Sequence, residues 1–181
     1  MDFLLLFGND FQVLIPELFI TLSICILLMY GVLNSTSFSA NFPILSRNVS
    51  WLCILTIGWS IYLMVNEGIF DFSGTSLYGL LKIDSWTQAT KLIVLTSALL
   101  SLLISLDYLK KEKLNDFEFS ILILLALLGM LFIISSHDLM SFYMAIELQS
   151  LSLYVLACFK RTSVLSVEAG LKYFILSAFS S

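Results

Sequence analysis

Two charged residues lie inside apolar segments near the end of the sequence, and they are the first candidates for chemistry. Glu147 lies in HDLMSFYMAIELQSLSLYVLACFK, and Lys172 lies in the following stretch, VLSVEAGLKYFILSAFSS. Each stretch is about as long as a helix that crosses a membrane. A charged side chain at membrane depth costs about 2.5–3.5 kcal/mol on insertion scales. We therefore expect an acid and a base buried in a membrane protein, and with them a path for protons or other ions.

Glu147 lies near the middle of its segment and has polar neighbours on the same helical face. Tyr143, Ser150 and Tyr154 stand at i−4, i+3 and i+7 from it. Such a stripe points into a helix bundle or a water-filled cavity, because polar groups facing lipid are costly. We expect Glu147 to exchange protons in this setting. The alternative is a glutamate held in a fixed hydrogen bond between two helices.

Each of the two lysines within apolar segments has two open interpretations. Glu168 precedes Lys172 by one turn, the favourable order for an i,i+4 ion pair. Either this local pair only neutralises Lys172, or the charge of Lys172 depends on Glu147 or on a further residue. Lys91 lies just inside the Trp86 end of another apolar segment. It either extends to the membrane surface, which is the usual fate of such a lysine, or lines a polar path.

The other candidate residues have structural interpretations. His137 and Asp138 form a turn, where helix capping or an interfacial position is expected rather than proton relay, and Glu17 is expected near a membrane surface. The three cysteines lie singly in apolar segments, without the spacing of metal ligands. An iron–sulfur cluster needs several clustered cysteines, and a single histidine excludes a bis-histidine haem. We expect neither a metal nor a cofactor in this chain.

The composition indicates the kind of fold that must position these residues. Of 181 residues, 59% are hydrophobic and 12% are charged, and the mean hydropathy is +0.99. Soluble domains are about 25% charged, so a soluble globular domain is excluded. We predict an all-α fold, a polytopic membrane helix bundle that forms a single domain over residues 1–181. Its six membrane helices are expected at about 11–33, 49–66, 86–108, 119–135, 137–160 and 164–181.

The connections between these helices predict how the chain crosses the membrane. The segment 67–84 is too polar to span, and its aromatic residues place it at the membrane interface. The turn at SSHD is very short, so helices four and five should be antiparallel neighbours, as should five and six. Six basic residues fall on one side, in the loops that hold Arg47, Lys110, Lys111, Lys113, Lys160 and Arg161. The positive-inside rule puts that side in the cytoplasm or matrix, and the N-terminus on the opposite side.

The last part of the chain resembles a known family. ELQSLSLYVLACFKRTS followed by EAGLKYFILSAFSS resembles the antiporter-like membrane subunit, called subunit two or subunit N, of respiratory NADH–quinone oxidoreductase, complex I. ELQSLSLYVL is closer to the mitochondrial form. The resemblance implies that Glu147 and Lys172 take part in proton translocation, with Glu168, Lys91, Tyr143 and Tyr154 as possible supporting residues. It also implies that flavin, iron–sulfur clusters and ubiquinone reduction belong to partner subunits.

The chain is much shorter than the members of that family. Family members carry about fourteen helices, so this sequence resembles the N-terminal part only. We expect a split subunit, in which a second polypeptide carries the remaining helices; a truncated sequence is the alternative. The expected partners are the other membrane-arm subunits and lipids, without nucleic acid. The expected location is the mitochondrial inner membrane with the N-terminus toward the intermembrane space, or else a bacterial plasma membrane.

Two other functions stay open. The chain could be a subunit of a multi-subunit cation–proton antiporter, a related family. It could also be a structural or assembly element of the membrane arm, with Glu147 and Lys172 as a static pair and no proton path of its own.

Overall fold

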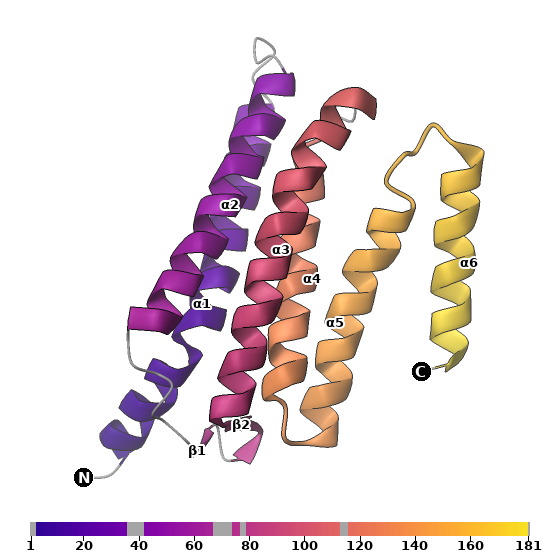
Figure 1. Cartoon of the computed structure of the whole chain (residues 1–181). Coiled ribbons are helices and arrows are strands. Elements are labelled where there is room, and N and C mark those ends of the chain that lie inside the picture. The colour runs from indigo at the N-terminus through magenta and orange to yellow at the C-terminus, as the bar shows by residue number, and fades with distance from the viewer. Residues whose placement is uncertain (1–2, 36–41, 67–73, 77–78, 113–115, 181) are drawn as a thin grey trace.

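Six helices and one small hairpin make up the part of the chain that the computed structural model describes, which is residues 3–35, 42–66, 74–76, 79–112 and 116–180 (Figure 1). The helices are α1 (Phe3–Ser35), α2 (Phe42–Asn66), α3 (Ser85–Glu112), α4 (Glu118–Ser135), α5 (Leu139–Ala157) and α6 (Val164–Ser180). Among them, α1 to α5 are long and apolar enough to cross a membrane. With 17 residues, α6 is slightly shorter than these spans. The predicted all-α membrane helix bundle is confirmed.

The first four helices form a bundle around a common apolar core. In this bundle α1 and α3 each pack against α2 and α4, so α1 and α3 face each other diagonally. The core side chains include several that are fully buried: Ile20, Val49, Cys53, Ile57, Leu95, Leu102, Leu124 and Leu131. A buried hydrogen bond of 2.7 Å joins the hydroxyls of Ser50 in α2 and Ser120 in α4. The Ser50 hydroxyl also donates to the carbonyl of Ser46 at 2.8 Å, so both hydroxyls have partners inside the bundle.

The last two helices extend outward from this bundle. α5 packs against α4, and α6 packs against α5 (Figure 1). The predicted antiparallel neighbours are thus confirmed. At the first of these contacts a glycine allows close approach: a Cβ added at Gly129 of α4 would lie 2.8 Å from the backbone nitrogen of Gln149 in α5. α6 has little cover within the described residues, and most of its side chains are exposed.

Two helices begin earlier than the sequence predicts. α1 begins at Phe3, so Pro16 lies inside the helix rather than in its opening turns. Proline cannot donate to the carbonyl four residues earlier, but the apolar residues before it continue the helix. α2 begins at Phe42, within a segment that is predicted to be a loop. There Pro43 stands in the first turn of the helix, where its missing N–H removes no hydrogen bond.

A β-hairpin that the sequence does not predict lies within the segment expected as an interfacial loop. β1 (Gly74–Ser76) pairs antiparallel with β2 (Leu81–Ile83), and Gly79 between them has a φ of 87°. In β2 the two end residues are buried and the middle one is exposed, the period-2 pattern of a strand. Outside the described residues lie 36–41 of the first predicted loop, 67–73 and 77–78 of the interfacial segment, Lys113 and Ser181.

The hairpin fixes the turn between α4 and α5. The backbone N–H of His137 donates to the carbonyl of Leu80 at 2.9 Å, and Leu81 forms a bridge to Ser136. Asp138 caps α5, because its side chain accepts a hydrogen bond of 3.3 Å from the N–H of Met140. The predicted capping role of this turn is confirmed for Asp138. The start of α5 is therefore held by both the hairpin and the cap.

Candidate proton-path site

Glu147 lies in the interior of α5 and is half-buried. It stands about 12 Å along the helix from Leu139, at 1.5 Å per residue. Its backbone carbonyl accepts a hydrogen bond from the hydroxyl of Ser150 at 3.0 Å. Within the described part of the chain no ion pair is formed by the Glu147 carboxylate. An acid in the middle of a membrane span therefore lacks a charged partner there.

The two tyrosines of the predicted polar stripe lie in different surroundings. Tyr143, one turn before Glu147, is 47% exposed, whereas Tyr154 is 7% exposed. The hydroxyl of Tyr154 donates to the hydroxyl of Ser177 in α6. Its ring also meets the ring of Tyr173 edge-on, with centroids 4.8 Å apart. Tyr154 therefore joins α5 to α6, and Tyr143 lies on an open part of the same face.

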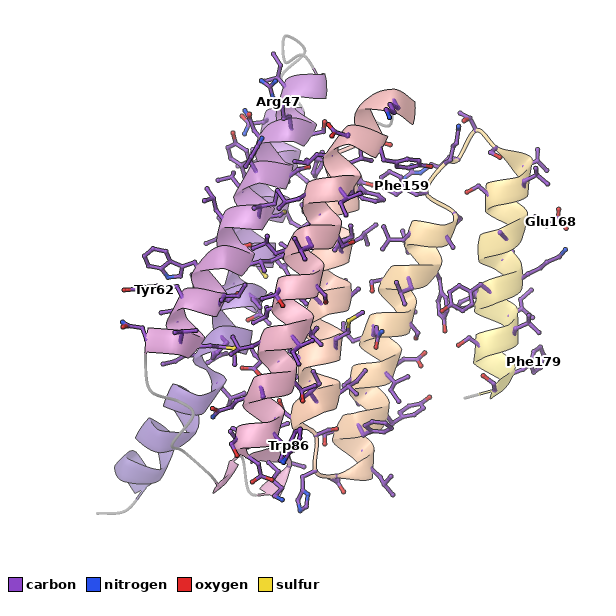
Figure 2. The ribbon with its side chains drawn as sticks, in the orientation of Figure 1. Arg47, Tyr62, Trp86, Phe159, Glu168 and Phe179 are labelled. Atoms are coloured by element: carbon purple, nitrogen blue, oxygen red, sulfur yellow. The ribbon has the colours of Figure 1, made fainter. Side chains whose placement is uncertain are left out.

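Lys172 pairs with the acid on its own helix. Its Nζ lies 2.6 Å from Oε1 of Glu168, and the two side chains are 70% and 52% exposed. No hydrogen bond or ion pair joins Lys172 to Glu147 among the contacts of the described residues. Figure 2 shows Glu168 on the side of α6 that points away from α5. Of the two interpretations left open for Lys172, the structure shows the local pair with Glu168 and no contact with Glu147 among the described residues.

Lys91 does not extend to the membrane surface, and that expectation is wrong. Its side chain is 4% exposed and forms an ion pair with Oε1 of Glu17, whose side chain is 1% exposed. The physical reason is that the Glu17 carboxylate of α1 gives Lys91 an oppositely charged partner inside the bundle. Glu17, which the sequence predicts near a membrane surface, stands three residues after the start of the candidate span Leu14–Asn34 and is buried in this pair. Gln88, one turn before Lys91, is buried as well.

The positions of the two residues in the sequence carry a signal for this ion pair. α1 and α3 cross in the same direction, because one helix lies between them. Glu17 and Lys91 both lie toward the N-terminal ends of the candidate spans Leu14–Asn34 and Ser85–Leu109. Two opposite charges at similar depth in the membrane are expected to pair with each other.

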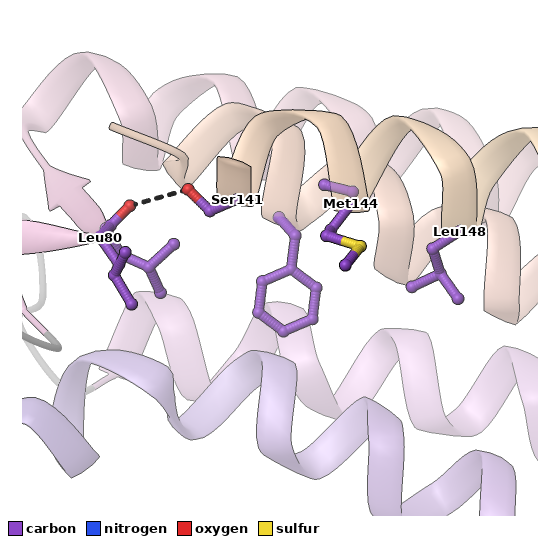
Figure 3. A pocket seen from close by; sticks show the side chains of 7 residues that line it. Leu80, Ser141, Met144 and Leu148 are labelled. Atoms are coloured by element: carbon purple, nitrogen blue, oxygen red, sulfur yellow. Dashed lines mark hydrogen bonds between the residues drawn. The ribbon is translucent and has the colours of Figure 1, made fainter. Parts of the chain in front are cut away.

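An apolar cavity of about 280 Å³ lies beside the start of α5. It is lined by the hairpin residues Leu80 and Leu81, by Phe132, and by Ser141, Met144, Ala145 and Leu148. Figure 3 shows the hydroxyl of Ser141 hydrogen-bonded to the carbonyl of Leu80, at 3.2 Å. Because no titratable side chain lines this cavity, it offers no group for proton exchange. Glu147, directly before Leu148, is not among the lining residues.

The sequence is similar to that of membrane subunits of NADH–quinone oxidoreductases. Residues 136–181 match the family model described as NADH:quinone oxidoreductase/Mrp antiporter, TM. The chain is 47% identical over 176 residues to NADH-ubiquinone oxidoreductase chain 2 of Marchantia polymorpha, and 41% identical over 174 residues to that of Arabidopsis thaliana. It is 42% identical over 168 residues to NADH-quinone oxidoreductase subunit N of Bartonella bacilliformis. These alignments cover 97%, 96% and 93% of this chain.

A solved structure gives the same result. The chain matches a chain of respiratory complex I from Thermus thermophilus with bound aureothin, with a TM-score of 0.58 and 26% identity over 87% of this chain. That match covers 33% of the Thermus chain, and the sequence matches cover 36%, 35% and 32% of the three relatives. The chain thus spans about a third of the length of the relatives it matches. The predicted resemblance is confirmed: over nearly its whole length, this chain is similar to chain 2 and subunit N of the NADH–quinone oxidoreductases.

Proposed function

We propose that this chain supplies the N-terminal portion of a proton-translocating subunit in the membrane arm of a respiratory NADH–quinone oxidoreductase. The similarity to chain 2 and subunit N supports this assignment. The observation that carries it is Glu147, an acid inside a membrane span that has no ion-pair partner among the described residues. It lies within the segment that the family model matches. An acid in that position is available to exchange a proton.

In this proposal the chain moves protons and other subunits move electrons. Flavin and iron–sulfur clusters belong to partner subunits, where NADH is oxidised and quinone is reduced. Glu147 takes up a proton from a hydrated path and releases it when the local electric field changes. Lys172 supports this step, because its exposed pair with Glu168 can open toward an acid on a covering helix. Tyr154 holds α6 beside α5 and so keeps the two segments in place.

The test is a substitution that removes the charge and keeps the shape. Glu147→Gln in the complete complex should leave assembly and NADH oxidation in place and lower the number of protons moved per NADH. The matched control is Glu118→Gln, the same change at the exposed first residue of α4. Its only ion pair among the described residues is a long contact of 3.5 Å with Arg161. Normal proton pumping by an assembled Glu147→Gln complex would refute the assignment.

The outer face of α6 supports a proposal about partners. Glu168 lies in the first half of the apolar helix α6 and Lys172 at its middle, and both side chains are more than half exposed. Facing lipid, such charges would cost several kcal/mol, so we propose that further helices of the same subunit cover them, supplied by a second polypeptide. Mass spectrometry of the purified complex should find a second apolar chain with the family's later helices. A single longer chain that contains this sequence would contradict the split.

A second candidate function is a subunit of a multi-subunit cation–proton antiporter. The description of the matching family model names both systems, which favours keeping this candidate. The same purification separates the two. Co-purifying flavin and iron–sulfur subunits support the respiratory complex, whereas co-purifying antiporter chains without them support the antiporter.

We further propose that the chain lies in a mitochondrial inner membrane or a bacterial plasma membrane, with its N-terminus away from the matrix or cytoplasm. Arg47 lies at one end of the bundle and Trp86 at the other (Figure 2). Thr162→Cys, in the turn before α6, should react with an impermeant maleimide from the matrix or cytoplasmic side only. Ser85→Cys, at the start of α3, should react from the opposite side. The reverse pattern would invert the orientation.

A further inference from the structure

The ion pair between Glu17 and Lys91 spans the interior of the four-helix bundle. Glu17 belongs to α1 and Lys91 to α3, and these helices face each other diagonally, with α2 and α4 between them. Both side chains are almost fully buried. The next residues on the same faces, Ile20 and Leu95, are fully buried in the apolar core. The pair therefore links two helices that the packing of the bundle otherwise keeps apart.

This pair and Glu147 lie at similar depth. α3 and α5 both begin at the end of the bundle where the hairpin lies (Figure 1). Lys91 stands about 9 Å along α3 from its first residue, and Glu147 about 12 Å along α5 from its first residue. Distance along the membrane normal therefore does not separate the two groups. What separates them is the helix that lies between.

α4 forms an apolar barrier between the two groups. It packs against α1 and α3 on one side and against α5 on the other. Its buried polar residues, Ser120 and Ser135, stand near its two ends. Between them the sequence ILILLALLGMLFII has no polar side chain. A proton passing from Lys91 to Glu147 through α4 would meet no hydrogen-bonding side chain along this stretch.

We propose that Glu17 and Lys91 form a diagonal lock, which sets the register of α1 against α3 and lies outside the proton path that contains Glu147. The second part of this statement rests on the proposed function, and the first part does not. A buried ion pair is damaged most when a single partner is removed, because one charge then stays buried and uncompensated. Replacing both partners by apolar side chains of similar size removes that penalty.

The experiment compares single and double replacements in the complete complex. Lys91→Met and Glu17→Leu should each lower the amount of assembled complex on native gels at least several-fold. The Glu17→Leu/Lys91→Met double variant should recover most of that amount. The recovered complex should move as many protons per NADH as the unaltered one. Glu147→Gln serves as the comparison for loss of pumping without loss of assembly.

Each result decides a separate point. A double variant that assembles no better than the worse single variant would show that the two residues do not act as a pair, and would overturn the lock. A double variant that assembles well but pumps fewer protons would place the pair in the proton path, and would overturn its separation from Glu147. Normal pumping by Glu147→Gln would instead contradict the proposed function. The comparison of assembly between the single and double variants at Glu17 and Lys91 would still stand, and so would the diagonal lock.

Discussion

Gly129 offers a sharp test of the contact that holds α5 against α4. A Cβ at this position would lie 2.8 Å from the backbone nitrogen of Gln149 and 2.9 Å from its Cβ. The backbone cannot rotate away, so α5 must move by about 0.6 Å to reach the 3.4 Å at which ordinary contact begins. Overpacking of this kind costs about 1–3 kcal/mol. Because Gln149 follows Glu147 by two residues, the shift also displaces the candidate acid.

Gly58 of α2 is the matched control, because a Cβ there meets no atom within 4 Å. Alanine raises helix propensity over glycine by about 1 kcal/mol at either position, so the difference between the variants isolates the clash. Gly129→Ala should reduce the amount of assembled complex several-fold relative to Gly58→Ala, and lower its midpoint of thermal inactivation. Equal amounts and equal midpoints for the two variants would refute the close contact between α4 and α5.

Three smaller changes test other contacts, each by the thermal stability of the assembled complex. Ser120→Ala leaves the buried hydroxyl of Ser50 without its 2.7 Å interhelical partner and should cost about 1 kcal/mol. Asp138→Ala removes the cap of α5 and should cost about 1 kcal/mol, whereas Asp138→Asn should cost much less. Tyr154→Phe removes the hydrogen bond to Ser177 and should cost about 1 kcal/mol. An unchanged stability would show that this hydrogen bond does not stabilise the contact between α5 and α6.

The helices are predictable because their signal is local. Runs of apolar residues long enough to span a membrane identify each one, and the short turn at Ser136 forces α4 and α5 to be neighbours. Helix starts are less well predicted, since polar residues such as those before Val49 continue a helix where packing favours it. The hairpin is missed for a different reason. Its strands have three residues each, and they are stabilised by contacts with the turn before α5, far along the sequence.

Pairing between charges is the part that the sequence leaves undetermined. Lys172 lies one turn from Glu168 and also on the helix next to Glu147, and only the structure shows that it takes the local partner. Lys91 has no acid on its own helix within one turn. Its similar depth to Glu17 indicates a partner, but the packing of α1 and α3 around α2 and α4 is what allows the two to meet. Local patterns locate the charges, whereas the arrangement of helices decides which of them meet.

The position of α4 divides the polar groups of this chain into two kinds. On its inner side, Glu17 and Lys91 compensate each other in the closed core. On its outer side, Glu147 has no ion pair among the described residues, and Lys172 is largely exposed. The inner pair is closed within the apolar core, whereas the outer acid lies on a helix beside a face that a further partner can contact. Changes inside the bundle should therefore alter how much complex forms, and changes on α5 and α6 should alter what each complex does.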